Sequence, residues 1–304
     1  MNTNSQNKST IQETVEQLTE NHSLQYPYIP IHERRLPSSV CLNEIIECIR
    51  SIVFPGYFGS PMVNDSSLVY HTGIGVEKIV NLLTQQIFDA LSFQSEDVNT
   101  LQAREQAHSL AHAFLKQLPH IKYMLSTDVK AIFNSDPAAK DYGEVIFCYP
   151  AIKAISNYRI AHELYVLGVP LIPRIISELA HSETGIDIHP GAQIGEYFSI
   201  DHGTGIVIGG TSIIGKHVML YQGVTLGAKN FTLDEDGHPI DVPRHPILED
   251  NVTIYSNSSI LGRITIGHDT IVGGNIWLTR SVPPYSKIVQ TRAIELALTD
   301  GAGI

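Results

Sequence analysis

The second part of the chain repeats a pattern every six residues, and this period restricts the possible folds more than any other feature. Taking every sixth residue gives two runs in which eleven of fourteen positions are Ile or Val: Ile188, Ile194, Ile200, Ile206, Ser212, Val218 and Val224, then Val252, Ser258, Ile264, Thr270, Ile276, Val282 and Ile288. A period of six matches neither a helix nor a simple strand alternation. It predicts a triangular coil with one short strand per side, whose turns stack at about 4.8 Å as a parallel β-helix.

The two runs are out of phase with each other. Val224 and Val252 lie 28 residues apart, which is not a multiple of six. A loop is therefore expected to leave the coil between Ala228 and Pro246, where the sequence is polar and contains prolines. Because loops that project from a rigid scaffold often carry functional residues, this loop is a candidate part of a site.

Glycine content divides the chain near residue 184. Only six of the 23 glycines fall in residues 1–184, and seventeen fall in 185–304. We therefore predict an α-helical domain over 1–184, a coil domain over 185–290 and a tail over 291–304, which is an α+β fold. Residues 1–30 are polar and are expected to be frayed, or helical only in context. Apolar residues at helical spacing and their flanking caps predict helices from Ser38 or Ser39 to Val53 and over 76–91, 97–118, 144–156 and 158–179.

Composition excludes several classes of partner. The chain has 304 residues and a formal net charge of −11, so it lacks the basic surface that binds nucleic acid or an anionic membrane. No segment approaches the roughly 20 apolar residues of a membrane span. The first ten residues also lack the basic start and apolar run of a secretion signal. The expected location is the cytoplasm.

Acidic and histidine side chains interrupt the aliphatic pattern on the first turns of the coil. Asp187 and His202 lie 15 residues apart, so with about 18 residues per turn they fall on neighbouring turns and could touch. A carboxylate that accepts Nδ1–H from an imidazole orients the ring and makes Nε2 a better base for an alcohol. Alternatively, both side chains bond only to local backbone at the corners, as Asp often does in turns. The spacing alone does not decide between a contact of Asp187 with His202 and these local backbone bonds.

The order of several segments carries a family resemblance. DIHPGAQIG, IDHGTGIVIGG, QGVTLG and RHPILEDNV follow one another, with SDPAAKDY upstream. Over roughly residues 125–290 this order resembles serine O-acetyltransferase, a family of hexapeptide-repeat enzymes. The resemblance implies a left-handed β-helix and transfer of acetyl from acetyl-CoA to L-serine, giving O-acetyl-L-serine for cysteine biosynthesis. It makes His202 the general base and Asp187 its orienting carboxylate, with direct transfer and no acyl-enzyme.

The resemblance also implies contacts for both substrates. It assigns the serine carboxylate to Arg244, with His245 adjacent, and the serine ammonium to Asp136 and Asp201. It assigns CoA to the backbone around Gly227 and Ala228 and to the coil near Ser256. It requires no metal and no permanently bound cofactor, because acetyl-CoA enters as a co-substrate.

Assembly and partners follow from the same resemblance. It implies a homotrimer or a dimer of trimers, with active sites between neighbouring coils. It also implies that the tail ending in Ile304 binds cysteine synthase, against the alternative of a free end with an accidental Ile. Two departures from the family pattern concern the site: the loop over 229–243 is longer and more acidic than is typical, and the small-residue segment expected after the last coil is missing.

Two other functions compete with this interpretation. One is a CoA-dependent acyltransferase that acts on a sugar or another amino alcohol, but such substrates need no paired contacts like Arg244 and Asp136. The other is a β-helix that serves only as a scaffold or regulatory subunit. The presence of both Asp187 and His202 argues against the scaffold.

Overall fold

The computed structural model describes residues 3–19, 36–59, 65–94, 100–230, 232–238, 240 and 242–291. The chain divides into two units, Met1–Arg34 and Arg35–Ile304. The first unit contains one described helix, α1 (Thr3–Thr19). The predicted tail lies outside the described residues from 292 onward, Ile304 included. No helix in the described ranges has both the length and the apolar character needed to cross a lipid bilayer.

The helices of the second unit precede the coil. They are α2 (Ser39–Val53), α3 (Asp65–Gln94), α4 (Thr100–Leu115), α5 (Leu118–Ser135), α6 (Tyr142–Cys148), α7 (Pro150–Val166) and α8 (Ile172–Thr184). The predicted cap of α2 is present, because the Ser38 hydroxyl accepts the N–H of Cys41 at 3.3 Å. The apolar face of α2, which includes Ile45 and Ile49, is buried.

Prolines set helix boundaries that the periodicity did not locate. The predicted helices over 144–156 and 158–179 are wrong, because α7 begins at Pro150 and α8 begins after Pro170. Both helices carry Pro within their first two residues, where its missing N–H costs no hydrogen bond. Pro119 plays the same part in α5, which the sequence reading did not predict beyond residue 118.

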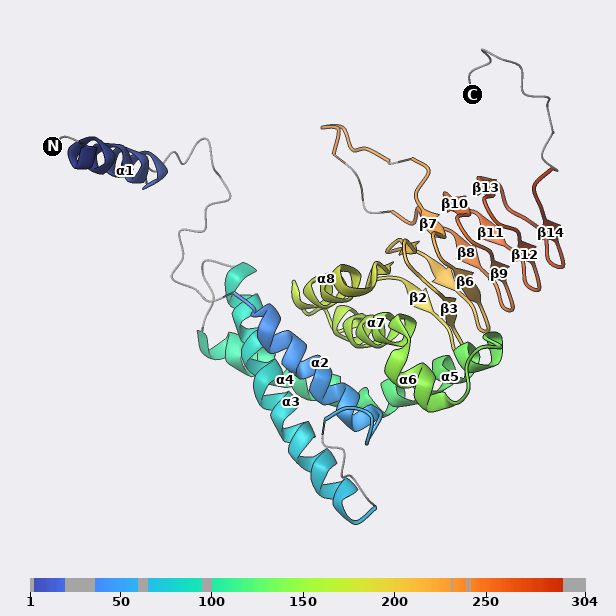
Figure 1. Ribbon diagram of the computed structural model, residues 1–304, viewed down its shortest axis with the longest axis horizontal. Coiled ribbons are helices and arrows are strands. Elements are labelled where there is room, and N and C mark those ends of the chain that lie inside the picture. The colour runs from blue at the N-terminus through green and yellow to red at the C-terminus, as the bar shows by residue number, and fades with distance from the viewer. Residues whose placement is uncertain are drawn as a thin grey trace. The chain divides into compact units, whose positions relative to one another are not determined.

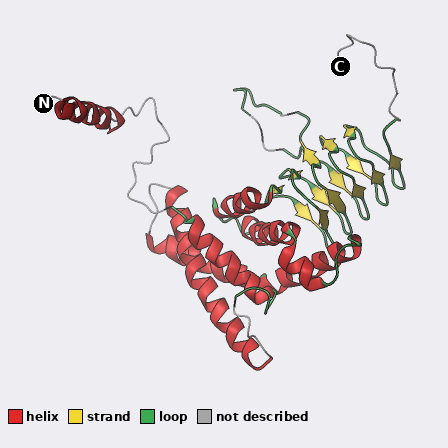
Figure 2. Ribbon diagram, viewed as in Figure 1, coloured by secondary structure: helices red, strands yellow, loops and turns green. Residues whose placement is uncertain are grey.

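In the residues that the structure describes, fourteen short strands form the coil, which confirms the predicted parallel β-helix (Figure 2). Their bounds are β1 (Asp187–Ile188), β2 (Gln193–Ile194), β3 (Ser199–Asp201), β4 (Val207–Ile208), β5 (Ile213–Ile214), β6 (Met219–Tyr221), β7 (Thr225–Gly227), β8 (Ile247–Leu248), β9 (Thr253–Ile254), β10 (Ser259–Leu261), β11 (Thr265–Ile266), β12 (Ile271–Val272), β13 (Trp277–Leu278) and β14 (Lys287–Ile288). They pair in parallel as three sheets, in the orders β1-β4-β7-β10-β13, β11-β8-β5-β2 and β14-β12-β9-β6-β3. Aliphatic positions of the six-residue pattern fill the interior, and Ile206, Val218 and Val224 are fully buried.

The predicted loop leaves the coil between β7 and β8. β7 ends at Gly227 and β8 begins at Ile247, in register with β5. The coil therefore continues after the insertion, and the phase slip in the sequence marks this one excursion. Within the loop, the Asp234 carboxylate accepts the N–H groups of Asp236 and His238.

A buried ion pair joins the helices to the first turn of the coil. Arg159 on α7 donates to Asp128 on α5 through Nε and Nη2, at 3.1 and 3.0 Å. The same guanidinium donates to the carbonyls of Ile194 and Gly195, and Asp128 accepts the N–H of Phe198. Figure 1 shows α5 and α7 beside β2 and β3 at this end of the coil. The pair thus holds α5 and α7 against the strands of the first turn.

Candidate active site

The candidate base lies at a left-handed corner that ends β3. His202 has φ 57° and is followed by Gly203 at φ 93°. Only glycine fits at 203, because a Cβ there would lie 2.5 Å from the Cδ1 of Ile186. The tight corner leaves the His202 side chain 74% exposed, with Nε2 3.6 Å from the Oδ1 of Asp201.

Two elements of the helical region bring Asp136 and Tyr149 together. Asp136 caps the C-terminus of α5, and Tyr149 lies between α6 and α7 in an extended conformation that suits the residue before Pro150. The Tyr149 hydroxyl donates to Oδ2 of Asp136 at 2.6 Å, and the N–H of Ala138 donates to Oδ1 at 2.8 Å. One oxygen of Asp136 thus stabilises the local turn, and the other accepts the hydrogen bond from the Tyr149 hydroxyl.

Electrostatic coupling connects these side chains to the corner. The hydrogen bonds from Tyr149 and Ala138 lower the pKa of Asp136, and the charge of His202 lowers it further. The bond to Asp136 and burial raise the pKa of Tyr149 to about 12, with a contribution from Asp201. We call Asp136, Tyr149, Asp201 and His202 the His202 corner. The sequence reading missed Tyr149, for which the Tyr-Pro step was the available signal.

A hollow of about 400 Å³ contains the other predicted serine contacts. We call it the His245 pocket, and its lining is Tyr165, Arg174, Asp187, His189, Val207, Ile208, Gly209, Gly210, Thr211, Arg244 and His245. Its lining therefore includes Asp187, Arg244 and His245, three of the predicted site residues. The helix residues Tyr165 and Arg174 were not predicted, because no local pattern ties α7 and α8 to this face of the coil.

Backbone contacts hold His245 in one orientation. The ring is buried, and Nδ1 accepts the N–H of Thr211 at 3.1 Å, so the ring's own proton lies on Nε2. The Thr211 hydroxyl lies 2.8 Å from the same Nδ1 and accepts the N–H of Arg244. Gly209 makes room for the ring, since a Cβ there would lie 2.0 Å from the Cδ2 of His245.

His189 lies in the same pocket, and a backbone N–H fixes its ring in the same way. Its Nδ1 accepts the N–H of Gly191 at 2.9 Å, and its ring meets that of Tyr165 edge-on at 6.0 Å. Gly210 makes this possible, because a Cβ there would lie 2.7 Å from Nδ1. The DIHP and GG segments thus shape one wall of the pocket.

The predicted contact between Asp187 and His202 is not formed. Asp187 begins β1, and its carboxylate is grouped with the ligand atoms of Glu178 and His181, which all lie within 4.8 Å of one another. Within the part of the chain that the structure describes, Asp187 and His202 share neither a hydrogen bond nor an ion pair. The carboxylate near His202 is that of Asp201, because both residues belong to the same corner. The orienting role of Asp187 stays a prediction.

The residues predicted for CoA flank the sheet that begins with β1. Gly227 ends β7, where it pairs with Leu261, and Ala228 follows it. Ser256 lies at the corner that leads into β10, and its carbonyl accepts the N–H of Asn275. Gly227 thus lies in the sheet that contains Asp187 and Ser256 lies at a corner beside it, and the assignment of CoA to these positions stays a prediction.

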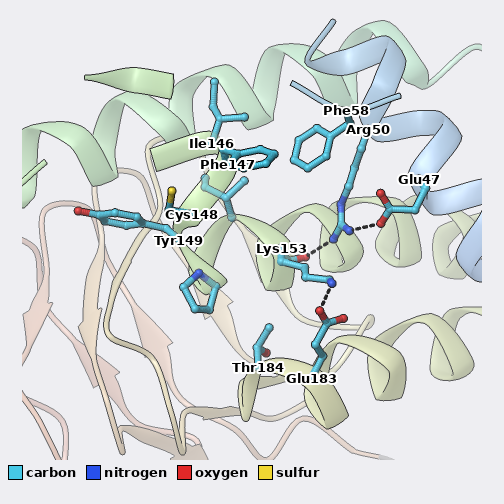
Figure 3. A pocket seen from close by; sticks show the side chains of 12 residues that line it. Glu47, Arg50, Phe58, Ile146, Phe147, Cys148, Tyr149, Lys153, Glu183 and Thr184 are labelled. Atoms are coloured by element: carbon cyan, nitrogen blue, oxygen red, sulfur yellow. Dashed lines mark hydrogen bonds and ion pairs between the residues drawn. The ribbon is translucent and has the colours of Figure 1, made fainter. Parts of the chain in front are cut away.

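A separate hollow of about 310 Å³ lies among α2, α6, α7 and α8 (Figure 3). Arg50 donates to Glu47 and to the carbonyl of Lys153, and Lys153 pairs with Glu183. Figure 3 shows the Tyr149 ring pointing away from these charges. The Arg50 and Lys153 cations of this hollow thus pair with carboxylates on α2 and α8.

Comparison with known proteins identifies the family. A scan against models of protein families gives no match. The chain is 48% identical over 275 residues to a serine acetyltransferase of Synechococcus elongatus, and the match covers 88% of this chain and 86% of that protein. The chain belongs to the serine acetyltransferase family. It is therefore an acyltransferase, as the order of its segments predicted.

Solved serine acetyltransferases have the same architecture. Serine acetyltransferase 1 of Entamoeba histolytica, in complex with L-cysteine, is 35% identical with a TM-score of 0.70, over 84% of this chain and 88% of that one. The serine acetyltransferase of Neisseria gonorrhoeae in complex with serine is 26% identical with a TM-score of 0.52, over 83% and 97%. These matches confirm the predicted succession of a helical region and a β-solenoid.

Proposed function

We propose that the chain transfers the acetyl group of acetyl-CoA to the hydroxyl of L-serine, giving O-acetyl-L-serine and CoA for cysteine biosynthesis. Nε2 of His202 removes the hydroxyl proton while the serine oxygen attacks the thioester carbonyl carbon. The carbon–sulfur bond then breaks, and the imidazolium returns the proton to the CoA thiolate. In this mechanism Asp187 is the carboxylate that orients and polarises the imidazole.

The observation that carries this proposal is the division of charge between the two parts of the site. The lining of the His245 pocket includes the Arg244 guanidinium and the His245 imidazole, residue types that suit a carboxylate. The His202 corner offers Asp136 and Asp201, which suit an ammonium, beside the base. An α-amino acid with a hydroxyl side chain satisfies both, whereas a sugar satisfies neither.

Assembly completes the site in this proposal. Asp201 and Asp187 belong to different sheets of the coil, and the His202 imidazole stands largely in solvent. A homotrimer, alone or paired as a dimer of trimers, places the corner of one copy beside the pocket of the next. Each active site then consists of residues from two copies.

The proposal is tested with purified protein, acetyl-CoA and a panel of acceptors. Release of the CoA thiol is measured with L-serine, D-serine, L-homoserine and a hexose. We expect fast release with L-serine and at least tenfold slower release with the others, because one misplaced group in a polar site costs about 1.4 kcal/mol or more. Equal rates with L-serine and the hexose contradict the proposal.

Arg244→Lys probes the carboxylate contact in the same assay. A lysine keeps the charge and loses the planar pair of donors, so we expect a higher KM for L-serine and an unchanged KM for acetyl-CoA. L-cysteine has the same ammonium and carboxylate as L-serine, and it is the ligand in the E. histolytica complex. We therefore expect it to inhibit competitively with L-serine.

A further inference from the structure

The single tryptophan of the chain stands on the outside of the coil. Trp277 begins β13 and is 72% exposed, whereas the next residue, Leu278, points inward and is 6% exposed. A ring of this size normally buries 150–250 Å² of surface in a core or an interface. Its position on a rigid strand therefore indicates a binding contact outside the coil.

The outer face that carries Trp277 also carries a residue of the candidate active site. Register pairs join one outward position on each of the five strands of this sheet, in the order Asp187, Val207, Thr225, Ser259 and Trp277. Figure 1 shows β7, β10 and β13 following one another toward the far end of the coil. Four strand spacings of about 4.8 Å place Trp277 roughly 19 Å from Asp187.

This separation matches the length of the co-substrate. About thirteen bonds connect the sulfur of CoA to its first phosphorus, equivalent to about four residues of extended chain, or roughly 15 Å. The adenine lies a few ångströms beyond, past the diphosphate and the ribose. A thioester placed between Asp187 and the His202 corner therefore brings the adenine to the level of Trp277. The side chains in between, Thr225 and Ser259, are small enough for the arm to pass over them.

Basic residues follow the same sheet where the phosphates would lie. Lys229, Arg263 and Arg280 each stand two residues after the end of β7, β10 and β13, and all three are exposed. One nitrogen of Arg263 already donates to the carbonyls of Thr211 and His245, which ties this column to the His245 pocket. In a chain with a net charge of −11, a column of cations beside an exposed aromatic ring suits a nucleotide.

We propose that Trp277 binds the adenine of acetyl-CoA by stacking, with Lys229 and Arg280 beside its phosphates. This inference rests on the proposed function, because it takes acetyl-CoA as the acyl donor. It makes Trp277 the residue that distinguishes the full co-substrate from a donor without a nucleotide. The ring contributes to binding and takes no part in the chemical step.

Fluorescence and kinetics test the proposal together. Because the chain has one tryptophan, its emission reports on this site alone. We expect CoA to quench the emission and pantetheine, which lacks the nucleotide, to leave it unchanged. Trp277→Ala should raise the KM for acetyl-CoA by about fivefold or more. It should leave the KM for S-acetylpantetheine, and kcat with either donor, unchanged.

A matched control and the opposing outcomes make the result decisive. Tyr285 is 78% exposed and lies outside this sheet, so Tyr285→Ala should leave both KM values unchanged. An unchanged KM for acetyl-CoA in Trp277→Ala, or equal changes with both donors, overturns the proposal. A shift in sedimentation of Trp277→Ala without the change in KM also overturns it, and assigns the ring to contact with a second copy. If neither acyl donor reacts with L-serine, the proposed function fails, while quenching by CoA still tests Trp277.

Discussion

The two parts of the candidate site are built in opposite ways. In the His245 pocket, two imidazoles lie against glycines and accept backbone N–H groups, so their tautomers and positions are fixed before a substrate arrives. At the His202 corner, the imidazole is 74% exposed and its nearby carboxylate is 3.6 Å away. The pocket side chains are thus held in place by the backbone, whereas the imidazole that we propose as the base is largely exposed.

This difference indicates how work is divided between the parts. Recognition benefits from rigid donors, because a fixed group loses little entropy when the ligand binds. The base must instead reach the hydroxyl and then the thiolate, so rotation of its side chain is useful. In the proposed trimer, the rigid surface of one copy would confine the mobile base of the next.

The largest expected effect comes from removing the base. We expect His202→Asn to lower kcat about 10²- to 10⁴-fold, the usual contribution of a general base. Asparagine tolerates the left-handed backbone at this corner, so the fold should be retained. The measurement is thiol release at saturating L-serine and acetyl-CoA.

A second corner histidine provides the control for this substitution. His217 also has a left-handed backbone, at φ 56°, and stacks on Tyr197 away from the pocket and the corner. His217→Asn should keep activity within a few-fold of the parent. Similar losses in both variants would mean that the coil corner, rather than the base, had been damaged.

Mixed assemblies test whether pocket and corner come from different copies. His202→Asn damages only the corner, and Arg244→Ala damages only the pocket. In trimers formed from equal amounts of the two inactive chains, about one site in four combines an intact corner with an intact pocket. We expect refolded mixtures to regain about a quarter of the parent activity.

The negative result of this experiment is equally informative. If the mixture stays as inactive as its two components, while sedimentation shows that mixed trimers formed, each site lies within one copy. The two parts would then have to close on each other inside a single chain.

A third prediction concerns the ion pair between Arg159 and Asp128, which joins α5 and α7 to the coil. Arg159→Met should lower the free energy of unfolding by about 3–5 kcal/mol, because it leaves the buried Asp128 carboxylate without its partner. Urea denaturation followed by circular dichroism measures the change. Lys78→Met removes the exposed Lys78–Glu44 pair and should leave the transition unchanged. Equal shifts in both variants would contradict the structural role of Arg159.

The repeat made the coil predictable, and prolines explain where the helices were misplaced. Each turn must bury an aliphatic residue at a fixed interval, so positions such as Ile206 and Val224 report the fold directly. The loop after Gly227 is also visible in the sequence, because it shifts the phase of the six-residue repeat. Helical periodicity was weaker evidence, because it continued through Pro150 and Pro170, where helices start.

The site was only partly predictable, because contacts between distant elements leave no spacing in the sequence. Motif matches located Arg244 and His245, and the structure places both in one pocket. The Tyr-Pro step marked Tyr149 as an extended residue before a helix, but it did not indicate that the hydroxyl would reach Asp136 on the other side of α6. The spacing of Asp187 and His202 allowed a contact but could not fix the direction of an exposed side chain.

The smallest predicted effect lies in the pH dependence set by Tyr149. Its hydrogen bond lowers the pKa of Asp136, so the carboxylate stays ionised to lower pH than an ordinary Asp. In Tyr149→Phe the pKa of Asp136 rises, and protonation begins at higher pH. The acid limb of kcat/KM for L-serine should therefore move to higher pH, with a loss of about two- to tenfold at neutral pH from poorer positioning. Tyr142→Phe is the control, because Tyr142 is exposed and its ring packs against that of Phe133 at an interplanar angle of 47°. An acid limb that stays in place in Tyr149→Phe would show that ionisation of Asp136 does not control serine binding, and would leave Asp201 as the carboxylate that holds the ammonium.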